Sequence, residues 1–154
     1  MPFHLSVFLE NKPGRLEKIM KVLAQHSVNL SAMSLASAGN FGIVKMLVDD
    51  PQKAFDELKK QNITVTKRKI AAVVIDNVPG AFYGLLRKLS AEGINIEDCY
   101  GFLLNDGKTA AMVLEIENQP DAEAVLKAME VNVVQEDKTS WRSEERRVGK
   151  ECRS

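Results

Sequence analysis

Hydrophobic residues change their spacing early in the chain, and each spacing predicts a different element. Apolar and polar side chains alternate over residues 3–10, which is the pattern of a half-buried strand. Apolar side chains then recur at i, i+3, i+4 and i+7 over residues 16–23, which is one face of an amphipathic helix. Those helical positions are Leu16, Ile19, Met20 and Leu23. Between the two lies Asn11-Lys-Pro-Gly14, whose proline and glycine end the strand.

The next residues complete a small module. Two strands are predicted over 29–37 and 41–48, with Gly39-Asn40 as the turn between them. Pro51 suits the first turn of a second helix, whose inward face holds Ala54, Phe55 and Leu58. The β-branched run at 63–66 predicts a closing strand.

The second half of the chain repeats the first at an offset of 66 residues. Asn77-Val-Pro-Gly80 repeats Asn11-Lys-Pro-Gly14, and the helical spacing returns over 82–89. Further matches in this register are Leu23/Leu89, Val28/Ile94, Asn29/Asn95, Leu30/Ile96 and Met46/Met112. Strands are predicted at 95–104 and 109–117 with a turn at 105–107, then a helix opening at Pro120 and a strand at 131–134. The repetition predicts two copies of one domain, residues 1–69 and 70–138.

The element order βαββαβ in each copy predicts the fold class. Right-handed crossovers turn this order into an antiparallel four-stranded sheet with two helices on one face, the α+β ferredoxin-like fold. A domain of about 70 residues buries only about 60 % of its surface and is marginal alone. We therefore expect pairing side by side, either of the two copies or of two chains. The joint at residues 67–69 has no Pro/Gly/Ser linker, so the copies should lie close together.

Composition narrows the class of partner and compartment. Lys+Arg and Asp+Glu both total 21, so the chain has no long-range field to attract nucleic acid. No apolar run reaches the roughly 20 residues of a membrane helix, and the first residues lack a signal-peptide pattern. Two cysteines make no disulfide framework. These features predict a cytoplasmic protein with no membrane and no nucleic-acid partner.

The last 13 residues, 142–154, are charged and non-periodic. They resemble the in-frame translation of a sequencing-library adapter joined to a truncated gene, so we interpret them as a non-native, disordered tail. The tail contains Cys152, and the native sequence beyond about Trp141 is then unknown. Without the tail, 16 basic and 18 acidic residues remain, a net charge of −2.

Catalytic, cofactor and metal motifs are not evident in the sequence. We interpret His4 and His26 as structural surface residues, because neither has a counterpart in the repeat. Cys99 stands alone on a predicted strand, and no His/Cys cluster has metal-ligand spacing. The acidic pairs Asp49/Asp50 and Glu115/Glu117 are read as solvated strand ends, and Gly39, Gly42 and Gly107 as hairpin glycines. We expect no enzyme, no cofactor and no metal.

The repeated Asn-x-Pro-Gly corner is the feature with chemical potential. Proline stiffens the turn, glycine allows close backbone approach, and the helix that follows begins with unpaired N–H groups that suit a carboxylate. Asn11 and Asn77 are candidate helix caps, which is the structural alternative. Asn29 and Asn95 follow the helix in each copy, and an amide both donates and accepts hydrogen bonds.

These motifs resemble the ACT domain, a small amino-acid-sensing module. The resemblance rests on Glu10-Asn-Lys-Pro-Gly-Arg-Leu16 with Val28-Asn29-Leu30, and on Asp76-Asn-Val-Pro-Gly-Ala-Phe82 with Gly93-Ile-Asn95-Ile96. It covers nearly all of residues 3–137, as in stand-alone tandem ACT proteins. It implies that units pair, often as one eight-stranded sheet, and that an amino acid binds between the loop of one unit and the facing unit.

The resemblance also implies which residues would bind the ligand. Asn11, Pro13 and Gly14 would frame one site, and Asn77, Pro79 and Gly80 another, with Asn29 and Asn95 contacting ligand from the helix end. Serine-sensing members carry a histidine two residues before the loop asparagine, where this chain has Leu9 and Ile75. That departure favours a more apolar ligand. The two corners also differ, since Lys12 and Arg15 are replaced by Val78 and Ala81.

The sequence therefore predicts a non-enzymatic regulator that binds a small amino acid where ACT units pair. The alternative is a ligand-independent interaction module, such as a regulatory subunit of an amino-acid biosynthetic enzyme or a transcriptional accessory protein. An RNA-binding domain needs exposed aromatics and a basic face, and only 6 % of the residues are aromatic. A small hydrolase of this fold would need a catalytic Arg/Asn loop, and Arg15 has no counterpart at Ala81.

Overall fold

The computed structural model describes residues 2–118 and 122–134 and divides into two compact units. The N-terminal unit is Phe3–Arg68, and the C-terminal unit holds Pro2 with the chain from Lys69 onward. The elements of the first six segments are β1 (Phe3–Glu10), α1 (Arg15–Gln25), β2 (Leu30–Ala38), β3 (Phe41–Val48), α2 (Pro51–Lys60) and β4 (Val65–Lys69). They follow the predicted βαββαβ order.

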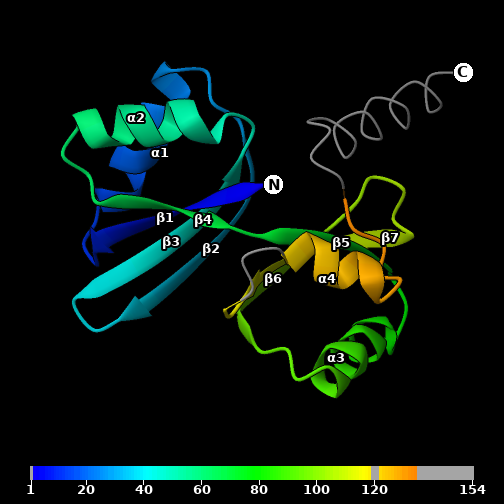
Figure 1. Ribbon diagram of the computed structural model, residues 1–154. Helices are drawn as coiled ribbons and strands as arrows, with labels where there is room; N and C mark the ends of the chain where they lie inside the picture. The colour runs from blue at the N-terminus through cyan, green and yellow to red at the C-terminus, as the bar shows by residue number, and fades with distance from the viewer. Residues whose placement is uncertain (1, 119–121, 135–154) are drawn as a thin grey trace, which may run out of the picture. The chain divides into compact units, whose positions relative to one another are not determined.

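The sheet of the N-terminal unit has the strand order β2-β3-β1-β4, the order of a ferredoxin-like domain. Strand β3 pairs antiparallel with both β1 and β2. Helices α1 and α2 lie together on one face of this sheet (Figure 1). The core between the two layers is made of inward-facing strand residues and the predicted helix faces, and its members include Leu5, Val7, Ile19, Leu23, Val44, Met46, Ala54 and Leu58.

The C-terminal unit repeats this plan with β5 (Ala71–Asp76), α3 (Ala81–Ala91), β6 (Ile96–Leu103), β7 (Thr109–Ile116) and α4 (Ala122–Ala128). Its sheet has the order β5-β7-β6. The predicted closing strand at 131–134 is reduced to one antiparallel bridge, Val73 to Val133, beside which the Val74 N–H donates to the Asn132 carbonyl at 2.9 Å. This bridge lies beside β5, just as β4 lies beside β1. Two antiparallel ferredoxin-like sheets with helices on one face are thus confirmed.

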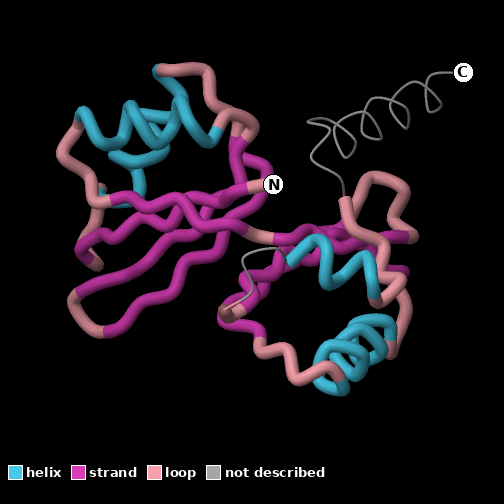
Figure 2. Tube along the Cα trace, in the orientation of Figure 1, coloured by secondary structure: helices cyan, strands magenta, loops and turns pink. Residues whose placement is uncertain are grey.

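Strand register corrects one of the predicted repeat matches. Leu5 pairs with Met46 in the first sheet, and its counterpart Ala71 pairs with Leu114 in the second. Met46 therefore corresponds to Leu114, and the match with Met112 was wrong. The cause is the hairpin, because two residues separate β2 from β3 while five separate β6 from β7 (Figure 2). The offset is 66 residues before this turn and one hairpin insertion larger after it.

Each described helix ends in the same left-handed turn. The N–H groups of Val28, Ile63, Ile94 and Val131 donate to the carbonyls of Leu23, Leu58, Leu89 and Leu126, five residues earlier, at 2.9–3.2 Å. The residue before each apolar donor has a positive φ, and these residues are Ser27, Asn62, Gly93 and Glu130. This is the Schellman arrangement, which brings the apolar residue after the helix against the leucine in its last turn. The sequence matches Leu23/Leu89 and Val28/Ile94 are therefore halves of one structural contact.

Three predictions about side-chain environment meet different outcomes. His26 is the residue at which α1 ends, and its Nε2 lies 3.3 Å from a Glu57 carboxylate oxygen, consistent with a surface residue. His4 was predicted on the surface but is fully buried. Glu115 was predicted to be solvated but is only 7 % exposed, whereas Glu117 is exposed as expected. Alternation assigns a strand residue to a sheet face but does not reveal how that face is covered.

Some predictions fall outside the described residues. They concern Pro120 as the start of the fourth helix, the end of the second domain at 138, and the tail 142–154 with Cys152. Among the described residues, no helix is long and apolar enough to cross a membrane.

The α2 leucine at the centre of the N-terminal core offers a test of this packing. Leu58 is completely buried, so Leu58→Ala leaves a cavity and is expected to lower the free energy of unfolding by about 2–5 kcal/mol. Lys59→Ala on the neighbouring position is the surface control. Urea unfolding followed by circular dichroism gives both values, and equal effects of the two changes would contradict the described core.

Candidate functional site

The repeated Pro-Gly corner is a type II turn in both units. In the first unit Gly14 has φ 84° and ψ −10°, and the Arg15 N–H donates to the Lys12 carbonyl at 3.3 Å. In the second unit Gly80 has φ 85° and ψ −11°, and the Ala81 N–H donates to the Val78 carbonyl at the same distance. Proline before a left-handed glycine is the combination this turn requires. Two separate segments thus reach one backbone geometry.

The corner asparagines do not cap the helices, which corrects the capping interpretation. Gly14 and Gly80 occupy the cap positions, and neither helix has a side-chain cap. Instead, the Asn11 side-chain amide donates to the Gly39 carbonyl at 3.1 Å, and the Asn77 amide donates to the Gly107 carbonyl at 3.2 Å. Each asparagine therefore fastens its corner to the tip of the neighbouring hairpin.

The backbone strengthens this attachment and leaves the helix start open. The Asn11 N–H donates to the Asn40 carbonyl at 2.8 Å, and the Asn77 N–H donates to the Lys108 carbonyl at 2.7 Å. Since the asparagine side chains are committed to the hairpins, the first amides of α1 and α3 receive no side-chain acceptor from them. Such amides, with the partial positive charge of a helix start, favour a carboxylate.

A pocket of about 390 Å³ opens beside the first corner. One wall is the corner itself, Glu10 to Gly14, and the rest is formed by Leu9, Leu16, Leu35, Ser37 and Gly42. Gly42 is therefore a pocket residue on β3 rather than a hairpin glycine, paired with both Leu9 and Ser37. Sequence reasoning missed Leu35, Ser37 and Gly42, because their place follows from strand register and not from a motif.

Both signs of charge line this pocket. Glu10 lies 3.0 Å from the Lys12 ammonium and 3.8 Å from the Arg15 guanidinium. The hydrogen bond from Lys12, then the charges of Lys12 and Arg15, hold the pKa of Glu10 below its ordinary value of 4.5. A carboxylate beside two cations and free amides can receive an ammonium group while its neighbours receive a carboxylate.

The helix-end asparagines lie elsewhere in each unit. Asn29 and Asn95 are exposed, and their carbonyls accept the N–H groups of Asp49 and Glu117 at 3.1 Å. The Asn29 N–H donates to Asp49 Oδ1 at 2.9 Å, whereas the Asn95 side chain donates to Glu117 Oε2 at 2.7 Å. Because strands rise about 3.3 Å per residue, Leu30 at the start of β2 lies roughly 23 Å from the pocket residue Ser37. One unit therefore does not bring its own Asn29 to its own corner.

No other described group competes as a reactive centre. Cys99 is half-buried on β6, and burial followed by the Asp98 charge raises the pKa of its thiol. Within residues 2–118 and 122–134, no three His, Cys, Asp or Glu side chains are grouped as metal ligands.

Two glycines of the second unit test the turn geometry by opposite effects. A Cβ added at either Gly80 or Gly84 meets nothing within 4 Å, but only Gly80 has a positive φ. Gly80→Ala is therefore expected to cost about 1–2 kcal/mol of stability through left-handed strain. Gly84→Ala, inside α3, should gain about 0.5–1 kcal/mol. Thermal unfolding of both variants checks the signs, and a stabilising Gly80→Ala would refute the left-handed turn.

Glu10 provides a titration test of the charged wall. Lys12→Met removes its strongest partner, so the pKa of Glu10 should rise toward 4.5, with Lys21→Met as the control on the same helix. Because the pKa is lowered by folding, this carboxylate's contribution to stability is complete above 4.5 and is lost as the pH falls through the folded value. Carboxyl-carbon NMR titration measures it, and an unchanged Glu10 pKa in Lys12→Met would contradict the pairing.

Comparisons with known proteins agree with this geometry. The family model described as an ACT domain pair matches residues 2–141. Protein BT0572 from Bacteroides thetaiotaomicron is 39 % identical, with a TM-score of 0.80 over 86 % of this chain and 91 % of that chain. The ligand-free regulatory subunit of aspartate kinase from Thermus thermophilus is 19 % identical, with a TM-score of 0.63 over 84 % and 91 % of the two chains, and shares the fold. No curated protein matches the sequence. With its duplicated corner and its family match over most of its length, this chain belongs to the ACT domain pair family.

Proposed function

We propose that this protein is a non-enzymatic regulator that binds a small amino acid at an ACT corner, where ACT units pair side by side. The observation that carries this proposal is the first corner. A type II turn opens an uncapped helix beside a pocket of about 390 Å³ that carries both a carboxylate and cations. The two corners give two candidate sites, framed by Asn11, Pro13 and Gly14 and by Asn77, Pro79 and Gly80.

Each part of an α-amino acid has a chemical counterpart at the first corner. The first amides of α1 and the Lys12 ammonium suit the ligand carboxylate, and Glu10 suits its ammonium group. Leu9, Leu16 and Leu35 offer apolar contact to its side chain. Asn11 holds the corner in place through Gly39 and thus acts as a positioning residue.

The helix-end asparagines enter the proposal from a second ACT unit, of this chain or of another copy. Asn29 and its own corner lie at opposite ends of β2, so one unit does not supply both. The ACT arrangement, in which a loop of one unit faces another unit, would combine Asn11 with a helix-end asparagine such as Asn95. Ligand bound there would link the paired units and favour one arrangement of them. Coupling energies of this kind are typically about 1–3 kcal/mol.

The regulated partner would be an amino-acid biosynthetic enzyme. The structures that share this fold include a protein named as a regulatory subunit of aspartate kinase, which illustrates an ACT pair without its own catalytic domain. In that role the paired units would report amino-acid level to the enzyme they accompany.

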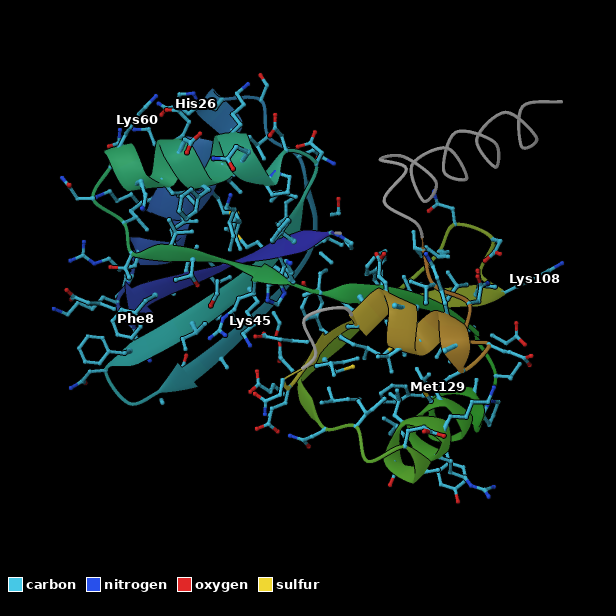
Figure 3. The ribbon with its side chains drawn as sticks, in the orientation of Figure 1. Phe8, His26, Lys45, Lys60, Lys108 and Met129 are labelled. Atoms are coloured by element: carbon cyan, nitrogen blue, oxygen red, sulfur yellow. The ribbon has the colours of Figure 1, made fainter. Side chains whose placement is uncertain are left out.

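A second candidate is a ligand-independent interaction module, and one surface observation favours it. Phe8, Phe41 and Ile43 are 42–47 % exposed, and the two rings stack at 5.1 Å. Phe8 lies on the side of the sheet away from the helices, where His26 and Lys60 are found with the helices (Figure 3). Exposed apolar groups of this kind often mark a protein contact. A pulldown from cell extract with and without amino acids separates the candidates, because a pure module retains its partner in both.

A thermal-shift screen of the twenty amino acids tests the proposed function. A ligand present at 100 times its dissociation constant should stabilise the fold by about 2.7 kcal/mol. Asn11→Ala frees the corner from the hairpin and should reduce the shift, while Lys53→Ala on α2 should not. If none of the twenty amino acids raises the melting temperature, the ligand-binding function is wrong.

A further inference from the structure

The two candidate corners have different walls once strand register, rather than sequence offset, defines equivalence. Leu9 pairs with Gly42, which also pairs with Ser37. In the second unit Ile75 pairs with Ala110, which also pairs with Leu103. Ser37 is thus matched by Leu103, and Gly42 by Ala110.

Both replacements put more side chain at the second corner. Gly42 has little spare room itself, since a Cβ there would lie 3.2 Å from the Ala36 carbonyl oxygen. Leu103 is 61 % exposed and stands on the same sheet face as Ala110, where the first unit has only a serine hydroxyl. The serine and glycine therefore keep the first corner open, and leucine and alanine narrow the second.

A third position does not restore the lost space. Leu35 of the first pocket is matched by Gly101, which could have left a gap. However, the Met112 sulfur lies 2.5 Å from where a Cβ on Gly101 would be, so Met112 occupies that space. Gly101 is thus a cradle for a neighbouring side chain and not an opening for a ligand.

The charges differ in the same direction. Glu10 and Lys12 form an ion pair at the first corner, whereas the second corner has Asp76 and Val78 at these positions. Without the lysine, the second corner has an acidic group but no matching cation for a carboxylate. A zwitterion is therefore better matched by the first corner than by the second.

From these differences we infer that only the first corner binds ligand, one per chain, and that its ligand is an α-amino acid with an aliphatic side chain. The inference rests on the proposed function and adds its stoichiometry and ligand class. Ser37 and Gly42 are specificity-determining residues because their small size admits the ligand side chain to Leu9, Leu16 and Leu35. The second corner keeps the turn as a structural element.

Isothermal titration calorimetry of the full chain tests this inference. The probes are L-leucine, L-isoleucine, L-valine and L-methionine, with L-serine and L-aspartate as polar comparisons. At least one aliphatic probe should bind with one site per chain, more tightly than either polar probe. Ser37→Leu copies the second corner into the first and should weaken binding at least about tenfold, as expected for a pocket overfilled by apolar atoms. The matched control Leu103→Ser, at the equivalent place in the second unit, should leave the affinity of the first site unchanged.

Several results would overturn the inference while leaving the proposed function intact. They are two ligands per chain in the wild type, tighter binding of serine or aspartate, and loss of binding in Leu103→Ser with full binding in Ser37→Leu. If Ser37→Leu unfolds, shown by a lost circular-dichroism signal, Ser37→Val makes the same steric test with a smaller change. Absence of heat with all twenty amino acids would overturn the proposed function and the inference together.

Discussion

The left-handed glycine in the Pro-Gly corner is the constraint on which the rest of the site depends. Only a residue without a Cβ takes φ near +85° at low cost, and this conformation turns the chain from the first strand directly into a helix. The turn leaves the helix start without a side-chain cap, while the preceding asparagine is drawn away to the hairpin. Open amides, a fixed loop and an adjacent pocket therefore follow from one backbone angle. Its recurrence in the second unit shows that the local sequence is sufficient to set it.

Much of this fold could be predicted from the sequence, because its signals are local and periodic. The faces of α1 and α3 follow from apolar spacing, and the corner follows from Pro13-Gly14 and Pro79-Gly80. The role of Asn11 was not predictable in this way. Its preference for caps is a local property, whereas its partner Gly39 is 28 residues away and is reached only when the hairpin pairs. The buried state of His4 and Glu115 likewise depends on how a sheet face is covered, which alternation does not report.

The two copies show how a duplicated domain can diverge without losing its frame. The second hairpin is longer, yet Asn77 still donates to a glycine carbonyl at the turn, as Asn11 does in the first copy. What is retained is the carbonyl at the hairpin tip rather than the length of the loop. By contrast, the walls of the corner have changed at Leu103, Ala110 and Val78, positions that shape a pocket but do not support the turn. A single sequence offset hides this distinction, because the insertion moves every later residue out of register.

The helix ends leave a reserve of heat tolerance in the molecule. Three of the four described Schellman turns place Ser27, Asn62 or Glu130 in the left-handed conformation, and only Gly93 meets it without a side chain. A left-handed residue that carries a Cβ is strained by about 1–2 kcal/mol, somewhat less for asparagine. Selection has evidently not driven these termini to their optimum, as is usual for proteins held just above the stability they need. A thermostable version of this protein is therefore accessible through glycine at Ser27 and Glu130, far in sequence from both Pro-Gly corners, for use as a rugged scaffold.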